Sequence, residues 1–248
     1  MAKRLVFGWH AVKALLEQHP ERVIKLQFLQ GREDRRHGEV RQLADQLGVP
    51  VESMARRKMD ELSEGGVHQG VIAHVKGARE PSEADLLERL AHAQHPPFLL
   101  ILDGITDPHN LGACMRTADA AGVDAIVVPR DRSAPLSPAA IKVASGAAES
   151  VPVVRVTNLA RFMRQCQEQG MWFAGTAGEA EASFYDLDLT GPLGIVMGAE
   201  GKGMRRLTRE HCDQLGKLPM AGMVSSLNVS VATGVCLFEA RRQRLKAL

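Results

Sequence analysis

The sequence predicts an α/β fold with a small N-terminal domain and a larger C-terminal domain built on a parallel sheet. Short apolar runs alternate with helical patterns along the chain, which is typical of βα units. A polar segment that ends at His95-Pro96-Pro97 interrupts this alternation, as a linker does. The 248 residues suffice for two modest cores. We therefore expect an N-terminal domain over 1–77, a linker over 78–97 and a second domain over 98–248.

The N-terminal region shows helical and strand patterns in close succession. Apolar residues at helical spacing predict helices over 8–18 and 34–47, the second of which ends before Gly48. Apolar–polar alternation and short apolar runs predict strands over 23–29, 49–54 and 71–75. These elements form one compact α/β unit that ends near Gly77.

The linker contains a helix, and βα units follow it. Pro81-Ser82 followed by the acids Glu83 and Asp85 marks the start of that helix. From residue 98 the apolar runs are nearly continuous, as in strands that are buried on both faces of a parallel sheet. Strands are expected over 98–102, 125–128, 151–156, 171–174 and 193–197, and a helix over 110–122. Ligands of such sheets bind in loops beyond the carboxyl ends of the strands.

Composition argues against a membrane-spanning or secreted protein. The longest apolar stretches, 99–102 and 195–197, are too short to cross a bilayer, and His10 interrupts any signal-peptide core. The four cysteines lack metal-ligand spacing, and the adjacent His211 and Cys212 would point in different directions on a helix. We expect reduced cysteines, no bound metal and a cytoplasmic location.

The net charge of +2 is mildly basic, and its distribution is uneven. Residues 1–78 carry 13 Lys and Arg against 10 Asp and Glu. The basic side chains gather in four clusters, over 32–41, 56–58, 205–209 and 241–246. Together the clusters favour phosphate binding, although any one of them alone is more typical of a solvated helix face. Aromatic residues make up only 4%, so base stacking would play a small part in binding RNA.

The first motif that carries chemistry covers residues 107–122 and links an expected strand to an expected helix. Asn110 is in position to cap this helix, and Arg116 lies within its second turn. A helix that starts directly after a buried strand is a natural anion site, and an arginine close to it strengthens that reading. The structural alternative is a capped helix whose arginine pairs with an acid.

The second motif, over 197–203, places three glycines directly after an expected strand. Such glycines mean that the backbone turns sharply or approaches a ligand closely. Their spacing is not that of a dinucleotide-binding loop, and no ribose-binding acid is recognisable downstream. The structural alternative is a tight turn with an exposed Glu200.

The third motif, over 218–234, is a loop of small residues that leads into a helix. Ser226 or Asn228 is in position to cap this helix. The helix mixes valines with Ser, Thr and Gly, a composition that permits close packing and often marks a subunit interface. The structural alternative is a capped core helix.

Together the three motifs resemble the SPOUT superfamily, and within it the SpoU (TrmH-like) RNA ribose 2′-O-methyltransferases. The resemblance covers 98–248, and Leu218 stands where isoleucine is frequent. The stretches 6–12 and 66–71 look like the substrate-binding domain of those members that methylate a guanosine ribose in large-subunit (23S) ribosomal RNA. The matching motif residues are Asn110, Gly112, Arg116, Gly198, Glu200, Gly203, Pro219, Ser226, Leu227, Asn228 and Ser230.

The resemblance implies a fold, a methyl donor and partners. The C-terminal domain is implied to form a deep trefoil knot, and two chains a homodimer whose site draws residues from both subunits. The implied methyl donor is S-adenosylmethionine, and the implied substrate is ribosomal RNA. Carried over residue by residue, the cofactor pocket is lined by Gly198, Leu218, Met220 and Leu227, with Thr176 as a further addition.

In the implied reaction the ribose 2′-hydroxyl attacks the sulfonium methyl, so the protein must align the hydroxyl and help remove its proton. The family's arginine, matched by Arg116, is proposed for that step, yet a guanidinium normally stays protonated. Arg116 either binds an RNA phosphate and orients the ribose, or accepts the proton in a buried, phosphate-paired setting. Asn110, Glu200, Ser226 and Asn228 are implied to orient the arginine, the ribose or the cofactor.

Three other functions compete with this interpretation. A transfer-RNA ribose methyltransferase of the same superfamily is disfavoured by the N-terminal α/β domain, since those relatives often carry short terminal helices instead. A non-catalytic RNA-binding or ribosome-assembly factor would not need intact Arg116, Glu200 and Asn228. A dinucleotide-dependent enzyme is disfavoured by the glycine spacing.

Overall fold

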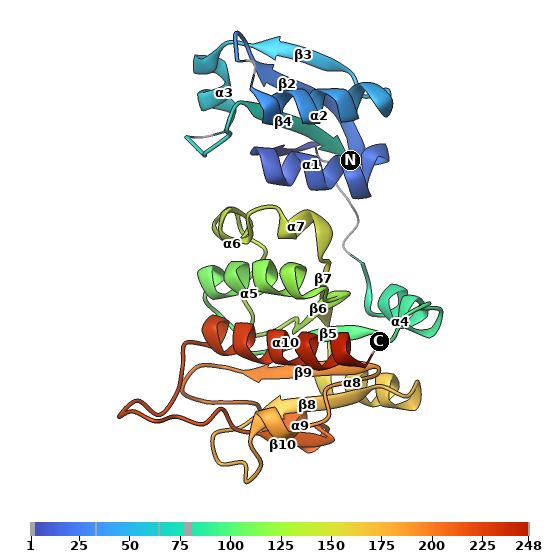
Figure 1. Cartoon of the computed structure of the whole chain (residues 1–248), viewed down its shortest axis with the longest axis vertical. Helices are drawn as coiled ribbons and strands as arrows, with labels where there is room; N and C mark the ends of the chain where they lie inside the picture. The colour runs from blue at the N-terminus through green and yellow to red at the C-terminus, as the bar shows by residue number, and fades with distance from the viewer. Residues whose placement is uncertain (1–2, 33, 64, 77–80, 248) are drawn as a thin grey trace. The chain divides into compact units, whose positions relative to one another are not determined.

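The computed structural model describes residues 3–32, 34–63, 65–76 and 81–247 (Figure 1). The chain divides into two compact units, Met1–Arg79 and Glu80–Leu248. The predicted domain boundary at residues 77 and 78 lies outside the described residues. Each unit has its own hydrophobic core, as the sequence predicts.

The N-terminal unit is a four-stranded mixed sheet with helices on both faces. Its elements are β1 (Lys3–Phe7), α1 (Trp9–Gln18), a 3-10 turn (Pro20–Arg22), β2 (Val23–Leu29), α2 (Arg35–Gln46), β3 (Val51–Met54), α3 (Arg56–Leu62) and β4 (Val71–Lys76). The strand order is β1-β4-β2-β3, with β4 antiparallel to both neighbours and β2 parallel to β3. Helices α1 and α2 pack over Leu26 and Phe28, and α3 packs on the other face against Met54 and Ile72.

The helices and strands predicted for this unit are all present, and two further elements, β1 and α3, were not predicted. Strand β1 is only five residues long and begins with the charged pair Lys3-Arg4. Helix α3 has seven residues, and Met59 is its one buried side chain. Neither segment is long enough or apolar enough to show a clear period in the sequence.

The C-terminal unit is a six-stranded sheet in which every strand pair is parallel. Its elements are α4 (Glu83–Ala91), β5 (Phe98–Asp103), α5 (Pro108–Ala121), β6 (Ala125–Pro129), α6 (Pro138–Ala144), α7 (Ala147–Ser150), β7 (Val153–Val156), α8 (Leu159–Glu168), β8 (Trp172–Thr176), a 3-10 turn (Phe184–Asp186), β9 (Leu193–Gly198), α9 (Arg206–Glu210), β10 (Gln214–Gly216) and α10 (Val229–Lys246). The strand order is β10-β8-β9-β5-β6-β7. The predicted parallel sheet and its five predicted strands are confirmed, whereas the three-residue β10 was not predicted.

Helices cover both faces of this sheet and place the three motifs at its edge. On one face α5 and α10 pack side by side, with α6 and α7 against α5 (Figure 1). On the other face α4 and α8 bury Leu86 and Phe162 against Leu99 and Ile101 of β5. All six residues of β5 are buried, which makes this strand the centre of the unit.

The segment predicted as a linker contributes α4 to the C-terminal unit. Ser82 and Asp85 form a capping box at the start of the helix, which confirms the predicted helix start. Leu86 and Leu90 are buried in the same hydrophobic cluster as β5 and α8. From its first helical turn the segment therefore packs as part of the second unit and is not a free connection.

The cysteines are free, and most are buried. Burial raises the pKa of Cys114 to about 11 and that of Cys236 to about 12, so both thiols stay protonated at neutral pH. Within the described ranges no helix has the length and apolar character needed to cross a membrane. The same ranges contain no group of three or more His, Cys, Asp or Glu side chains that could hold a metal ion.

Gly112 lets α5 pack closely on α6, because a Cβ there would lie 2.4 Å from the carbonyl oxygen of Ala140. We expect Gly112→Ala to lower the free energy of unfolding by about 1–3 kcal/mol, since α6 would have to move. Gly38→Ala in α2 is the control: no atom lies within 4 Å of its added Cβ, so the stability of its unit should stay equal or rise slightly. Chemical denaturation of both variants checks this, and an unchanged Gly112→Ala would show that the helices adjust freely.

Candidate functional site

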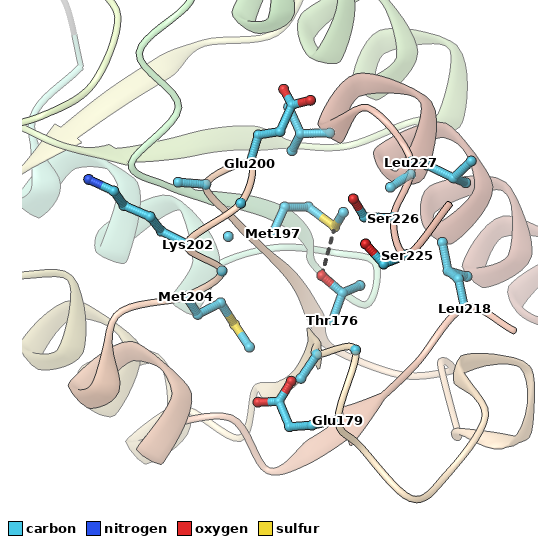
Figure 2. A pocket seen from close by; sticks show the side chains of 18 of the residues that line it. Thr176, Glu179, Met197, Glu200, Lys202, Met204, Leu218, Ser225, Ser226 and Leu227 are labelled. Carbon is cyan, nitrogen blue, oxygen red and sulfur yellow. Dashed lines mark hydrogen bonds between the residues drawn. The ribbon is translucent and has the colours of Figure 1, made fainter. Parts of the chain in front are cut away.

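A cavity of about 450 Å³ opens where three neighbouring strands of the C-terminal unit end (Figure 2). Its walls are the loops that follow β8, β9 and β10 and the first turn of α10. Parallel strands bring their carboxyl ends to one edge, so the loops meet there although they are far apart in the sequence. The size suits a small-molecule cofactor. All five residues predicted to bind the cofactor line the cavity: Thr176, Gly198, Leu218, Met220 and Leu227.

The glycine loop after β9 is a tight turn with an exposed Glu200, which was the structural alternative for this motif. The backbone N–H groups of Ala199 and Gly203 each donate to the other residue's carbonyl, at 3.0 and 2.8 Å. Gly201 and Gly203 adopt left-handed φ values of 73° and 67°. A Cβ on Gly198 would lie only 2.2 Å from the carbonyl carbon of Gly203. The close approach that requires this glycine is therefore to the chain's own backbone.

An ion pair between a buried carboxylate and a half-exposed arginine fixes the end of this glycine loop. Asp103, at the end of β5, is 1% exposed, and its carboxylate accepts from the Arg205 backbone N–H at 2.8 Å and from its Nε at 2.6 Å. The residue that follows the loop is thereby tied to the central strand of the sheet. A buried carboxylate needs hydrogen-bond donors, and Arg205 can donate to Asp103 only while the glycine loop keeps this position.

The inside of the cavity combines an apolar wall with small hydroxyl groups. Figure 2 shows the hydroxyls of Ser225 and Ser226 turned toward Met197 and Thr176, with Leu218 and Leu227 on the same wall as the serines. The Thr176 hydroxyl lies 3.4 Å from the carbonyl of Val196 and 3.7 Å from the sulfur of Met197. Such a lining suits a ligand with an apolar ring and several polar edges.

Charged side chains stand at the rim of the cavity. Glu200 and Lys202 project from the glycine loop, and no described residue pairs with either of them (Figure 2). On the opposite side, Glu179 and Arg209 form an ion pair. Sequence reasoning missed Glu179, Lys202 and Arg209 as cavity residues. Glu179 and Arg209 meet only through the order of β8, β9 and β10, and nothing in their spacing announces it.

The starts of α5 and α10 meet beside the cavity. Asn228 caps α10, as predicted, whereas α5 is capped by Asp107 and not by Asn110. The His109 N–H that donates to Asp107 lowers the pKa of that carboxyl group, and Asn110 lies inside the first helical turn. The Nδ2 of Asn228 donates to Oδ1 of Asn110 at 3.1 Å, so two of the predicted site residues touch directly.

Arg116 is set apart from the other predicted site residues. It lies exposed in the third turn of α5 and does not line the cavity. Among the described residues it has no hydrogen-bond or ion-pair partner. The structure thus places Glu200 and Ser226 at the cavity, and Asn110 and Asn228 beside it. Within this one chain, the guanidinium of Arg116 is hydrogen-bonded to none of them.

Two family models match the chain. The SpoU rRNA Methylase family matches residues 97–238, and the RNA 2′-O ribose methyltransferase substrate binding model matches residues 5–81. Among curated relatives, the 23S rRNA (guanosine-2′-O-)-methyltransferases RlmB of Photorhabdus laumondii and Escherichia coli K12 are each 60% identical over 240 residues. These alignments span 97% of this chain and 98% of each relative.

Solved structures agree with the family models. The SpoU methyltransferase AviRb from Streptomyces viridochromogenes, in complex with AdoMet, superposes with a TM-score of 0.77 at 25% identity, over 98% of this chain and 91% of AviRb. The AdoMet-bound rRNA methyltransferase from Sinorhizobium meliloti gives 0.75 at 26%, over 97% and 87%. The A. aeolicus TrmH/SpoU tRNA modifying enzyme gives 0.57 at 29% and covers 66% of this chain and 85% of its own.

We expect Arg205→Ala to loosen the glycine loop, because Asp103 would keep only the backbone N–H as a donor. The free energy of unfolding should fall by about 1–3 kcal/mol, and amide hydrogen exchange over 199–204 should become faster. Arg206→Ala is the matched control, since the Arg206 side chain is 77% exposed and, among the described residues, pairs only with Glu210 on the surface of α9. Equal exchange rates in the two variants would contradict the anchoring role of Arg205.

Proposed function

Because the chain belongs to the SpoU rRNA methylase family, we propose that it transfers the methyl group of S-adenosylmethionine to the 2′-hydroxyl of a guanosine ribose in 23S ribosomal RNA. The observation that carries this proposal is 60% identity, over nearly the full length, to curated methyltransferases of that specificity. A transfer-RNA substrate is disfavoured because the tRNA-modifying neighbour covers only 66% of this chain. We expect the enzyme to act in the cytoplasm. The trefoil knot that the family resemblance implies remains a prediction.

The cavity of the C-terminal unit fits S-adenosylmethionine. Leu218 and Leu227 offer an apolar wall for the adenine, and Ser225, Ser226 and Thr176 offer hydroxyls and backbone groups for the polar edges. When bound, the cofactor supplies a methyl group on a cationic sulfur, which is already a good electrophile. The protein's part is therefore to orient the ribose and to exclude water from the methyl group.

We assign phosphate binding to Arg116. A guanidinium is protonated at physiological pH and presents only donors, so it is a poor base and a good partner for a phosphate. Its exposure and its lack of a described carboxylate partner leave it available for RNA. Glu200 and Ser226 hold oxygen atoms at the cavity and support orientation of the ribose hydroxyl there.

We propose that the enzyme is a homodimer with α10 in the interface. Val231, Phe238 and Leu245 are 53%, 49% and 57% exposed although they are apolar. A spacing of seven residues puts all three on one face of the helix, as in helices that pair with a second helix. A second copy on this face would also bring its own surface residues close to the cavity. A site completed in this way would explain why Arg116 does not line the cavity of its own chain.

We place an RNA contact of the N-terminal unit around Trp9. The guanidinium of Arg36 lies 5.6 Å and the Lys13 ammonium 5.1 Å from the centre of the Trp9 ring. Arg36 is exposed and forms no ion pair with a described carboxylate. The Trp9 backbone N–H donates to Gln69 at 2.9 Å, and Gln69 holds a left-handed φ of 50° on an exposed loop. An aromatic plane flanked by cations suits a nucleotide and its phosphate.

The function is tested in cells that lack the gene, by mapping 2′-O-methyl groups in 23S ribosomal RNA. The wild-type gene should restore one guanosine methyl group, and Arg116→Ala should not, because the RNA phosphate loses its clamp. Isothermal calorimetry should give the same affinity for S-adenosylmethionine in both proteins, since Arg116 lies outside the cavity. Arg164→Ala, an exposed change on α8, is the control for charge. No binding of S-adenosylmethionine to the wild type would refute the proposed function.

Arg36→Gln should weaken binding of a 23S ribosomal RNA fragment about fivefold and reduce the slope of log affinity against log salt by about one. Arg41→Gln is the matched control: its guanidinium is on the same helix and also lies over an aromatic ring, 5.1 Å from the centre of Phe28. Fluorescence anisotropy at several salt concentrations measures both variants. Equal losses would mean that only the net charge of the unit matters, and that Trp9 marks no contact.

A further inference from the structure

The hydrogen bonds of Asn228 fix which way its side-chain amide points. Its Oδ1 accepts from the Ser230 backbone N–H at 2.9 Å and from the Ser230 hydroxyl at 2.6 Å. A backbone N–H only donates, so the atom that faces it must be the amide oxygen. The NH₂ half of Asn228 therefore points the other way, toward Asn110.

The same reasoning fixes the amide of Asn110. The NH₂ of Asn228 is a donor, so Asn110 must present its oxygen to it, and the two atoms are 3.1 Å apart. The NH₂ of Asn110 then lies on the side of the amide that faces away from Asn228. In the described part of the chain no group accepts a hydrogen bond from it, yet it is not among the buried side-chain atoms without a partner, so this side reaches solvent.

We infer that Ser230 and Asn228 hold Asn110 in one polarity, so that Asn110 donates a hydrogen bond to an oxygen of the RNA backbone near the reacting ribose. The inference rests on the proposed function, which supplies the RNA. Asn228 is in this view a positioning residue, and Asn110 is the group that touches RNA. The phosphate and ribose oxygens of RNA are both acceptors, so a donor is the polarity that this surface requires.

A second residue of α5 has the same polarity. Arg116 stands on the same helix and also has only donors to offer. A reversed Asn110 amide would turn an oxygen toward RNA oxygens and would place the NH₂ groups of Asn110 and Asn228 against each other. Two hydrogen bonds would be lost at once, so the relay from Ser230 selects the binding-competent state.

Asn228→Asp tests the relay, because Asp also caps helices well and keeps both bonds from Ser230. Its second carboxylate oxygen is an acceptor, so Asn110 must turn its NH₂ inward and its oxygen toward RNA. We expect kcat for 23S ribosomal RNA to fall about tenfold or more, while the melting temperature and the affinity for S-adenosylmethionine stay unchanged. Asn228→Ser caps α10 without reaching Asn110, so the Asn110 amide can adopt either orientation. We expect kcat to fall about threefold in this variant.

A double-mutant cycle separates the polarity of Asn110 from the added charge. In an Asn110→Ala background there is no amide to turn, so Asn228→Asp should cost no more than about twofold in single-turnover rate. A full tenfold cost in that background would overturn the inference, because the charge alone would then explain the loss. Wild-type activity in Asn228→Asp would overturn it as well. Absence of methyl transfer by the unmodified enzyme would instead mean that the proposed function is wrong.

Discussion

The buried carboxylate of Asp103 is the constraint on which the candidate site depends. It ends the central strand β5, where a charge without partners would be costly, and Arg205 supplies both a backbone and a guanidinium donor. That pairing fixes the chain directly after the glycine loop and so the wall of the cavity that carries Glu200. Gly198 is needed for a steric reason, because a Cβ there would collide with the backbone of Gly203 and Met204. The shape of the cavity thus depends on the hydrogen bonds of Asp103 at the end of β5 as much as on apolar packing.

The pairing of α5 with α10 is the second half of the site. Thr233 is fully buried between the helices near Cys114. A Cβ built on Gly234 would make only an ordinary contact with Thr117, at 3.7 Å. Because the two helices start at the same edge of the sheet, their first turns meet, and Asn228 reaches Asn110. Packing of the helix bodies thereby brings the two amides together, and the hydrogen bonds from Ser230 set their polarity.

Most strands and helices of the second unit can be predicted from the sequence, because its strands are apolar on both faces and its motifs lie in order along the chain. It shows less of the first, since β1 and α3 are too short for a periodic signal. Within the site, the cavity lining at Gly198 and Leu227 follows from the family resemblance of the motifs, but the cap of α5, which is Asp107, was wrongly placed at Asn110. Both residues are good caps, and only the backbone geometry decides between them. The Glu179–Arg209 ion pair has no sequence signal, because strand order and not spacing brings its members together.

Under the proposed function the two halves of the site divide the chemistry between them. Arg116 and Asn110, both on α5, offer donors, which suit the anionic RNA backbone and leave nothing to take the proton of the 2′-hydroxyl. The cavity side offers oxygen atoms, with Glu200 as a carboxylate that no described residue neutralises. A ribose held by donors on one side and facing acceptors on the other would present its hydroxyl oxygen to the methyl group and its proton to the acceptors. The arginine then needs no unusual basicity, because its proposed task is to hold the phosphate in place.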